Sequence, residues 1–344
     1  MLELHFINVG DGDSILIREE SGRRHFDMLV DAGRPEILPE EGSLRLSAAE
    51  YLAALGVTHL DLLVVTHLHI DHFGGVGTLL SGIYVDQVIS GYFPSAEGKR
   101  ICRTSDQKTV RGLIDCLNDW AETVERMKKQ GVHLVPVSQT VNLKPTPRLA
   151  LDILCPNPEE MRRQTERWEA LLAGKDLPEE ELVHSSKLRN PLSLRVRLYY
   201  AGREIELSGD CLGAGWEESG KKPCDLWKVP HHGDIKSVTP ELVETLHPRY
   251  AVISCEKGYN AKKDRPAACV IDLLRKNGAE VWFTDTYEAP WYTSGRHRAV
   301  VFTVEDDGTI LSPGGDRKYS PGGEKKVSPE GRKGFEDNDN NGNV

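Results

Sequence analysis

The fold is decided by residues 66–75, which read Thr66-His67-Leu68-His69-Ile70-Asp71-His72-Phe73-Gly74-Gly75 and directly follow the apolar run 60–65. Three imidazoles and one carboxylate fall within six positions: His67, His69, Asp71 and His72. Imidazole nitrogens and carboxylate oxygens are ligands that zinc and similar transition ions take in proteins. An exposed loop that happens to hold three histidines is the alternative, but the glycine pair lets the backbone pack tightly where a helix would begin. The segment therefore predicts a metal centre at the end of a buried strand.

The spacing of these side chains indicates two ions. His67 and His69, two positions apart at the end of a strand, can face one ion, and Asp71 and His72, after the turn, can reach a second. Asp210 ends another strand in a Ser-Gly-Asp turn, where a carboxylate can span two ions about 3.5–4 Å apart. An aspartate that only caps a turn is the alternative. We expect two divalent ions, with Zn²⁺ favoured over Mn²⁺.

Two further segments could complete the ligand sets. In Val229-Pro230-His231-His232-Gly233, adjacent histidines on an extended chain would project to different sides, so at most one should bind an ion directly. We predict His231 as the ligand, and His232 as a residue that supports a ligand or protonates the leaving group. His184 falls in an expected loop before a strand. It is either the third ligand of the first ion or an ordinary exposed histidine.

Two aspartates at turns are candidates for orienting the ligands. Asp13 lies in a glycine turn, and Asp31 ends a strand before Gly33. Carboxylates at such points commonly accept the second N–H of a metal-bound imidazole. Ordinary turn chemistry explains both residues equally well.

The bulk composition is that of a soluble globular protein, with 39% hydrophobic residues and no apolar run of membrane-span length. The first residues alternate like a strand and lack the basic and apolar regions of a signal peptide. Seven scattered cysteines, never spaced as CxxC, indicate a reducing compartment, and we expect a cytoplasmic protein. The net charge of −10 argues against broad attraction to a nucleic-acid backbone, although bound ions could reverse the field locally.

The pattern of strands and helices indicates one large α/β (α+β) domain over residues 1–312. Strands are expected at 2–9, 14–18, 26–30, 60–65, 192–200, 204–207, 228–230, 250–254, 281–284 and 299–304. Helices are expected at 48–55, 109–130, 240–246 and 267–277. Two runs of strands, each with helices, predict two sheets packed face to face with helices outside.

Two helical insertions are expected, near 91–131 and 156–189, and the polar segment 313–344 is predicted to be a disordered tail. The second insertion carries mixed charges on a predicted helix. Its arginines either form a solvated face or also touch the substrate: Arg162, Arg163 and Arg167.

These motifs resemble the metallo-β-lactamase superfamily, whose HxHxDH loop is matched without a gap by residues 67–72. Further blocks, in the expected order, look like the hydrolase domain of ComEC-like DNA-uptake proteins: residues 6–14, 31–33, 190–194, 208–210 and 228–233. The resemblance implies an αββα sandwich, a two-metal hydrolytic centre and a supporting role for Asn190 beside the ligands. The channel of ComEC proteins has no counterpart in the sequence, so DNA transport is not implied.

One position departs from that pattern. ComEC-like chains usually carry Asn, a short gap and then His-Pro after the strand that follows the double histidine, whereas here Asn260 is followed by Arg265-Pro266. An arginine can bind a substrate phosphate bidentately, but it cannot ligate a metal or donate a proton at neutral pH. Arg265 and Asn260 are therefore candidate substrate-binding residues.

The expected function is metal-dependent hydrolysis. A hydroxide held between two ions would attack the substrate, and His232 or a metal-bound water would protonate the leaving group. Asp71 and His232 are the candidate catalytic residues, and Asp71 would also bind metal. The resemblance favours a phosphodiester in DNA or RNA. A hydrolase of small esters, lactones or cyclic phosphodiesters is the first alternative. A metal-stabilised regulatory module without catalysis is the second, but a purely structural ion would need only four closed ligands.

Overall fold

The computed structural model describes residues 1–21, 24–38, 41–95, 97–256, 265–285, 288–289, 292–293 and 297–313. The predicted tail, apart from Pro313, and the candidate residue Asn260 lie outside these ranges. In the part of the chain that the structure describes, no helix combines the length and the apolar character needed to cross a membrane.

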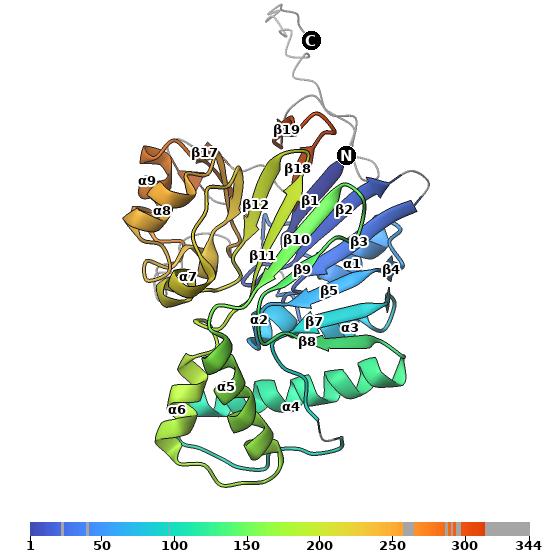
Figure 1. Ribbon diagram of the computed structural model, residues 1–344, viewed down its shortest axis with the longest axis vertical. Helices are drawn as coiled ribbons and strands as arrows, with labels where there is room; N and C mark the ends of the chain where they lie inside the picture. The colour runs from blue at the N-terminus through green and yellow to red at the C-terminus, as the bar shows by residue number, and fades with distance from the viewer. Residues whose placement is uncertain are drawn as a thin grey trace, which may run out of the picture.

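Two sheets form the centre of the molecule (Figure 1). The strands of the first, in spatial order, are β19 (Ile310–Leu311), β18 (Ala299–Val304), β1 (Leu2–Ile7), β2 (Ile15–Ser21), β3 (Arg24–Val30), β5 (Leu62–Val65), β7 (Gln87–Ser90) and β8 (His133–Pro136). Those of the second are β15 (Glu280–Phe283), β14 (Tyr250–Ile253), β13 (Leu226–Lys228), β12 (Arg203–Leu207), β11 (Arg195–Tyr200), β10 (Leu149–Leu154) and β9 (Val141–Leu143). Two short ribbons pair β4 (His59–Leu60) with β6 (Tyr84–Val85) and β16 (Glu288–Ala289) with β17 (Tyr292–Thr293).

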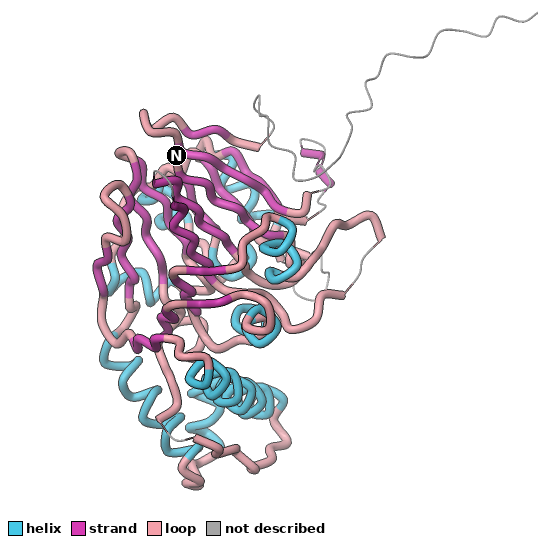
Figure 2. The backbone as a smooth tube through the Cα atoms, turned by 90° about the vertical axis from the view of Figure 1, so that its right-hand side faces the viewer, coloured by secondary structure: helices cyan, strands magenta, loops and turns pink. Residues whose placement is uncertain are grey.

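Three apolar clusters show how the layers pack. The middle cluster joins the facing sides of the two sheets, with Phe6 and Phe302 from the first and Leu198 and Leu226 from the second. The second cluster packs the outer side of the first sheet against α1 (Ala48–Ala54), α3 (Val76–Leu79) and α4 (Lys108–Lys129). The third packs the outer side of the second sheet against α7 (Gly213–Ser219), α8 (Pro240–Leu246) and α9 (Ala268–Lys276). Helices therefore cover both outer faces of a two-sheet sandwich, as predicted (Figures 1 and 2).

Local signals explain several boundaries. Helix α1 begins after Ser47, whose side chain accepts from the Glu50 backbone N–H while the Glu50 carboxylate accepts from the Ser47 backbone, and it ends before Gly56 at a φ of 71°. Helix α4 buries the predicted stripe, including Leu117 and Trp120, because that stripe packs on the first sheet.

Two expectations about the elements need correction. The strand predicted over 60–65 is divided at Asp61, whose backbone and side chain pair with Asp27 of the neighbouring strand. The charged insertion forms two helices, α5 (Pro158–Leu172) and α6 (Glu179–Lys187), which gather with α4 at one end of the molecule (Figures 1 and 2). Trp168 of α5 and Leu182 of α6 join the apolar cluster of α4, so these helices are part of the core.

Candidate metal centre

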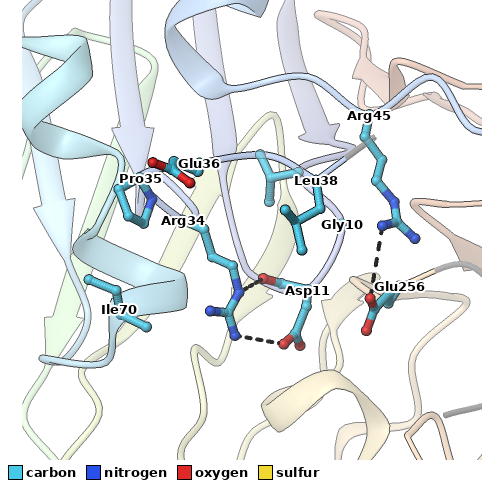
Figure 3. Close-up of a pocket in the computed structure, with 10 residues that line it drawn as sticks. Gly10, Asp11, Arg34, Pro35, Glu36, Leu38, Arg45, Ile70 and Glu256 are labelled. Atoms are coloured by element: carbon cyan, nitrogen blue, oxygen red, sulfur yellow. Dashed lines mark hydrogen bonds and ion pairs between the residues drawn. The ribbon is translucent and has the colours of Figure 1, made fainter. Parts of the chain in front are cut away.

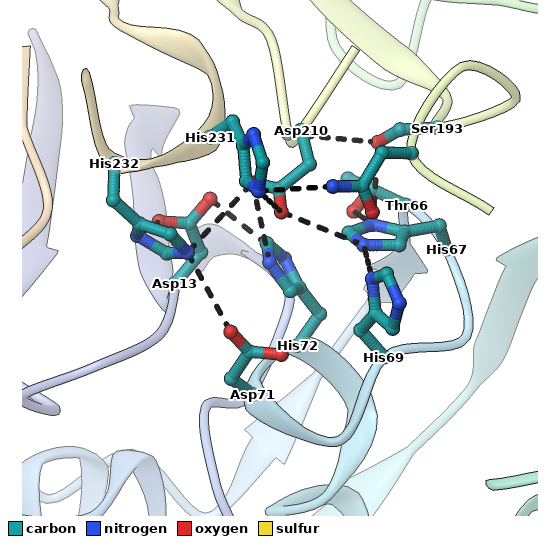
Figure 4. Close-up of polar contacts among 12 residues, drawn as sticks. Asp13, Thr66, His67, His69, Asp71, His72, Ser193, Asp210, His231 and His232 are labelled. Atoms are coloured by element: carbon teal, nitrogen blue, oxygen red, sulfur yellow. Dashed lines mark hydrogen bonds and ion pairs between the residues drawn. The ribbon is translucent and has the colours of Figure 1, made fainter. Parts of the chain in front are cut away.

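The candidate ligands come from strands whose carboxyl ends meet at one edge. Strands β3 and β5 run parallel, so Asp31, after β3, lies beside the motif that follows β5. Strands β12 and β13 also run parallel, so Asp210, after β12, lies beside the double histidine that follows β13. Ligand sites in α/β folds commonly form at such carboxyl edges. The two sheets bring these groups together (Figure 4).

The first group contains His67 and His69. Nε2 of His67 lies 2.8 Å from Nδ1 of His69 and 3.7 Å from Oδ2 of Asp210. The hydroxyl of Thr66 donates to Asp31, 2.7 Å away, so Nδ1–H of His67 donates to that hydroxyl oxygen at 3.1 Å. The lone pair of His67 Nε2 is therefore directed into the centre.

The second group contains Asp71, His72 and His232. Nε2 of His232 lies 3.6 Å from Oδ2 of Asp71, and Nε2 of His72 lies 3.4 Å from Oδ1 of Asp210. Nδ1 of His72 faces the Asp31 carboxylate at 2.7 Å, and Nδ1 of His232 faces the backbone oxygen of Ser254 at 3.2 Å. Both partners only accept, so both rings carry their N–H on Nδ1 and turn Nε2 toward the centre.

Asp210 stands between the two groups. Its Oδ2 faces His67, and its Oδ1 lies 3.4 Å from His72 Nε2 and 3.8 Å from His232 Nε2. One carboxylate with an oxygen on each side is the arrangement that bridges two ions.

The donor set fits divalent metal ions. Ligand atoms of His67, His72 and Asp210 lie within 4.8 Å of one another, and so do those of Asp71, His72 and His232. Three of the atoms that face the centre are buried and have no hydrogen-bond partner: His72 Nε2, His232 Nε2 and Asp210 Oδ1. Leaving such atoms unpaired costs free energy, and a cation among them would satisfy all three.

The electrostatics of the cluster agree with a cation site. Burial lowers the pKa of His69 to about 3 and that of His67 well below its usual range, so both rings are neutral at pH 7. Burial alone would lower the pKa of His72 and raise that of Asp210, but Asp210 and Asp31 hold the His72 pKa well above its usual range. His72 and His232 in turn hold the Asp210 pKa well below its own. The carboxylates thus favour positive charge at the Nε2 positions, which a divalent ion supplies.

Two aspartates and a glycine lie around the candidate ligands. Asp31 accepts from His72 and also from the backbone N–H and hydroxyl of Thr66, which fixes the His72 ring. Asp13 accepts from Lys228 and lies 3.7 Å from His72 Nδ1 and 3.9 Å from His232 Nδ1. A Cβ at Gly12 would lie 2.4 Å from the Asp71 backbone oxygen, so only glycine lets this turn approach the motif.

The double histidine differs from the prediction. His231 and His232 have φ angles of 52° and 56°, so the chain is not extended there and both rings turn toward Asp210. Both ring nitrogens of His231 already have partners, the Asn190 amide at 3.0 Å and the Ser237 hydroxyl at 3.1 Å. The geometry favours His232 as a ligand with His231 beside it, and the roles of the two histidines stay predictions.

The loop position predicted for His184 is wrong. His184 lies on α6, where Leu182, Ser185 and Ser186 face the protein and leave the histidine exposed. None of the candidate metal groups among the described residues includes it.

Arg265 lies next to the centre. Its Nε donates to Asp234 at 3.0 Å. Burial lowers the pKa of His231 to about 4; Asp210 opposes this shift, and the positive charge of Arg265 adds to it. The predicted contact with substrate stays a prediction. On the second inserted segment, the exposed side chains of Arg162 and Arg163 pair with Glu166 and Glu159, as a solvated face would.

Two supporting residues were not identified from the sequence. Lys228 is fully buried and ties Asp13 to the Gly209 backbone oxygen, 3.0 Å away. Arg189, also buried, donates to the Leu68 backbone oxygen at 3.1 Å and so braces the loop between His67 and His69. Lys228 is the first residue of the recognised block 228–233, and Arg189 directly precedes the block 190–194, so their positions were the available signal.

One family model and one curated relative match parts of this chain. Residues 7–91 match the model of the metallo-beta-lactamase superfamily. ComE operon protein 3 of Bacillus subtilis (strain 168) is 23% identical over 298 residues, which are 82% of this chain and 32% of that protein. The chain thus spans about a third of the length of this curated relative.

Solved structures similar to this chain include two bacterial proteins. The metallo-beta-lactamase fold protein YhfI from Bacillus subtilis is 12% identical, with a TM-score of 0.40, over 82% of this chain and 96% of that one. Zn(2+)-bound PqqB from Methylobacterium extorquens is 11% identical, with a TM-score of 0.41, over 82% and 97%.

Proposed function

We propose that this chain, which has the metallo-β-lactamase fold, is a metal-dependent hydrolase that cleaves phosphodiesters in DNA or RNA. The observation that carries the proposal is the Asp210 carboxylate, which stands between two histidine groups whose ring nitrogens face it. Two bound divalent ions, zinc or manganese, would polarise a phosphoryl oxygen and activate water at neutral pH.

The residues of the chain have separate tasks in this proposal. His67 and His69 would hold one ion, and Asp71, His72 and His232 would hold the other, with the Asp210 carboxylate available to both. Asp31 and the Ser254 backbone oxygen keep the imidazoles of His72 and His232 oriented through their Nδ1 atoms, and Asp13 lies 3.9 Å from Nδ1 of His232. Because His232 turns its unpaired Nε2 toward the ligands, we do not assign it the proton-donor role that the sequence suggested.

The substrate class is supported by the resemblance to the ComEC-like hydrolase domain and by Arg265. This arginine lies beside His231, and its side chain is 24% exposed, so it can contact a phosphate oxygen. The free cysteines fit a reducing compartment, and we extend the proposal to a cytoplasmic location.

A hydrolase of small esters, lactones or cyclic phosphodiesters is the second candidate. The net charge of −10 favours it, because a polynucleotide would be repelled except near bound ions. Turnover of a polynucleotide should fall steeply with salt, whereas turnover of a small substrate should not.

The test is an assay of the metal-loaded protein on single-stranded DNA, double-stranded DNA, RNA, bis(p-nitrophenyl) phosphate and a lactone. The double variant Asp71→Ala/His72→Ala is measured beside the wild type. We expect phosphodiester cleavage by the wild type and none by the variant. Equal activity of the two proteins would refute the proposed mechanism, and cleavage of the lactone alone would favour the second candidate.

A further inference from the structure

Figure 3 shows the residues that line a cavity of about 440 Å³, one of which, Arg34, interacts electrostatically with Asp71 of the candidate metal centre. Ile70, one of its lining residues, directly precedes the ligand Asp71. Another lining residue, Asp11, belongs to the turn that packs against residues 67–72. In this turn the Asp13 backbone N–H donates to the Asp71 backbone oxygen at 3.1 Å. A group attached to a phosphate at the metal centre would therefore reach this cavity, whose volume suits a small organic moiety.

Two guanidinium groups line the cavity, that of Arg45 held inside the protein and that of Arg34 with an unused donor. Arg45 is 5% exposed and held by Asp285, which accepts from its Nε at 2.6 Å, while its Nη1 lies 3.9 Å from Glu256. Its Nη2 is buried and has no hydrogen-bond partner. Arg34 uses Nε and Nη2 to bind Asp11, at 3.1 and 2.8 Å, and among the described residues no hydrogen bond engages its Nη1. A ligand here should carry hydrogen-bond acceptors.

The other walls of the cavity are apolar or acidic. Leu38, 70% exposed, and the half-buried Ile70 offer surface for a flat ring. Asp11, Glu36 and Glu256 are carboxylates, which disfavour a second phosphate group in the same space. A nucleobase matches these walls. Its ring faces are apolar, and its edge carries carbonyl and ring-nitrogen acceptors for an arginine and amino donors for a carboxylate.

We propose that this cavity is a subsite for the nucleobase next to the scissile phosphodiester, with Leu38 and Ile70 against the ring and Arg34 on its acceptors. The inference rests on the proposed function and deepens it, since it names the residues that would contact a base of the DNA or RNA substrate.

The binding test uses saturation-transfer difference NMR with thymidine on the metal-loaded protein, with 2-deoxyribose as the control probe. We expect transfer to the thymine H6 and methyl protons, none to 2-deoxyribose, and loss of the thymine signal in Leu38→Asp. Because Leu38 is exposed, this change should leave the fold intact. Tyr84→Asp, at another exposed hydrophobic position, is the matched control and should keep the signal. No transfer to thymine in the wild type, or the same transfer in Leu38→Asp, would overturn the inference.

A kinetic test separates this subsite from the metal centre. Thymidine 5′-(p-nitrophenyl phosphate) is compared with methyl p-nitrophenyl phosphate, which has the same leaving group and no base. For Arg34→Gln we expect kcat/KM to fall about tenfold, through KM, with the thymidine ester only. An equal fall with both esters would place the effect of Arg34 at the metal centre and contradict the subsite. If the wild type cleaves neither ester while thymidine still binds, the proposed function fails and the cavity assignment stands.

Discussion

Oδ2 of Asp31 lies 2.7 Å from Nδ1 of His72, and this contact directs His72 Nε2 toward Asp210. The carboxylate therefore selects the ring nitrogen that is offered to an ion, although Asp31 itself does not face the centre. Carboxylates in this position raise the basicity of the ligand and fix its orientation.

Replacing Asp31 should weaken metal binding without unfolding the protein. For Asp31→Asn we expect metal affinity to fall about 10–100-fold, because a neutral amide does not raise the basicity of the His72 imidazole as a carboxylate does. Competition with a chromophoric chelator measures this affinity. Asp176→Asn, at an aspartate 93% exposed, is the control and should bind as the wild type does. Unchanged affinity in Asp31→Asn would show that the contact does not tune the site.

The two adjacent histidines should differ in their effect on stoichiometry. We expect His232→Ala to bind about one ion per chain, because His232 Nε2 is buried, unpartnered and 3.6 Å from Asp71. His231→Ala should keep two ions, since both ring nitrogens of His231 already have polar partners. Metal titration of both variants decides the matter, and the opposite pattern would restore His231 as the ligand.

The buried pair of Lys228 and Asp13 should contribute strongly to stability. Lys228 is fully buried and Asp13 nearly so, and Lys228→Met would leave the carboxylate uncompensated. We expect the free energy of unfolding to fall by about 3–5 kcal/mol, measured by urea denaturation. The double variant Lys228→Met/Asp13→Asn also removes the unpaired buried carboxylate, so it should recover part of the lost free energy of unfolding. If Lys228→Met is as stable as the wild type, the ion pair does not contribute to the free energy of unfolding as expected.

Helix α4 should behave as core rather than as a removable insertion. Trp120 is fully buried, its ring packs on Phe73 and Phe93, and its indole N–H donates to the Tyr92 backbone oxygen at 2.9 Å. We expect Trp120→Ala to lower the free energy of unfolding by about 3–5 kcal/mol in the same measurement. Lys129→Ala, on the exposed side of the helix, should change it little, and similar values for the two variants would argue that α4 packs loosely.

Much of the architecture was accessible from the sequence because local patterns carry it. The apolar run before residue 66, the Ser47–Glu50 capping box and the stripe on α4 each specify an element without reference to distant residues. Strand β10 carried a similar signal, since Leu149, Leu151 and Ile153 alternate toward the core, and it was missed. Strands β8 and β9 are short and partly exposed, so their sequences resemble those of loops.

The residues that meet at the candidate site were predictable from the sequence, but their geometry was less so. The candidate ligands in residues 67–72 and Asp210 can be identified from residue type and position. The left-handed backbone at His231 and His232 could not be predicted from residue type. The exposure of His184 depends on how α6 packs, and the partner of Lys228 lies 215 positions away. Such long-range contacts follow from the assembled sheets and not from local patterns.

The most direct test of a two-ion centre is the metal content of the purified chain, measured by inductively coupled plasma mass spectrometry beside Asp210→Ala. We expect two divalent transition-metal ions per wild-type chain and fewer than one in the variant, because both groups of ligands share this carboxylate. A wild-type chain without transition metal, or a variant that retains two ions, would contradict the centre described above.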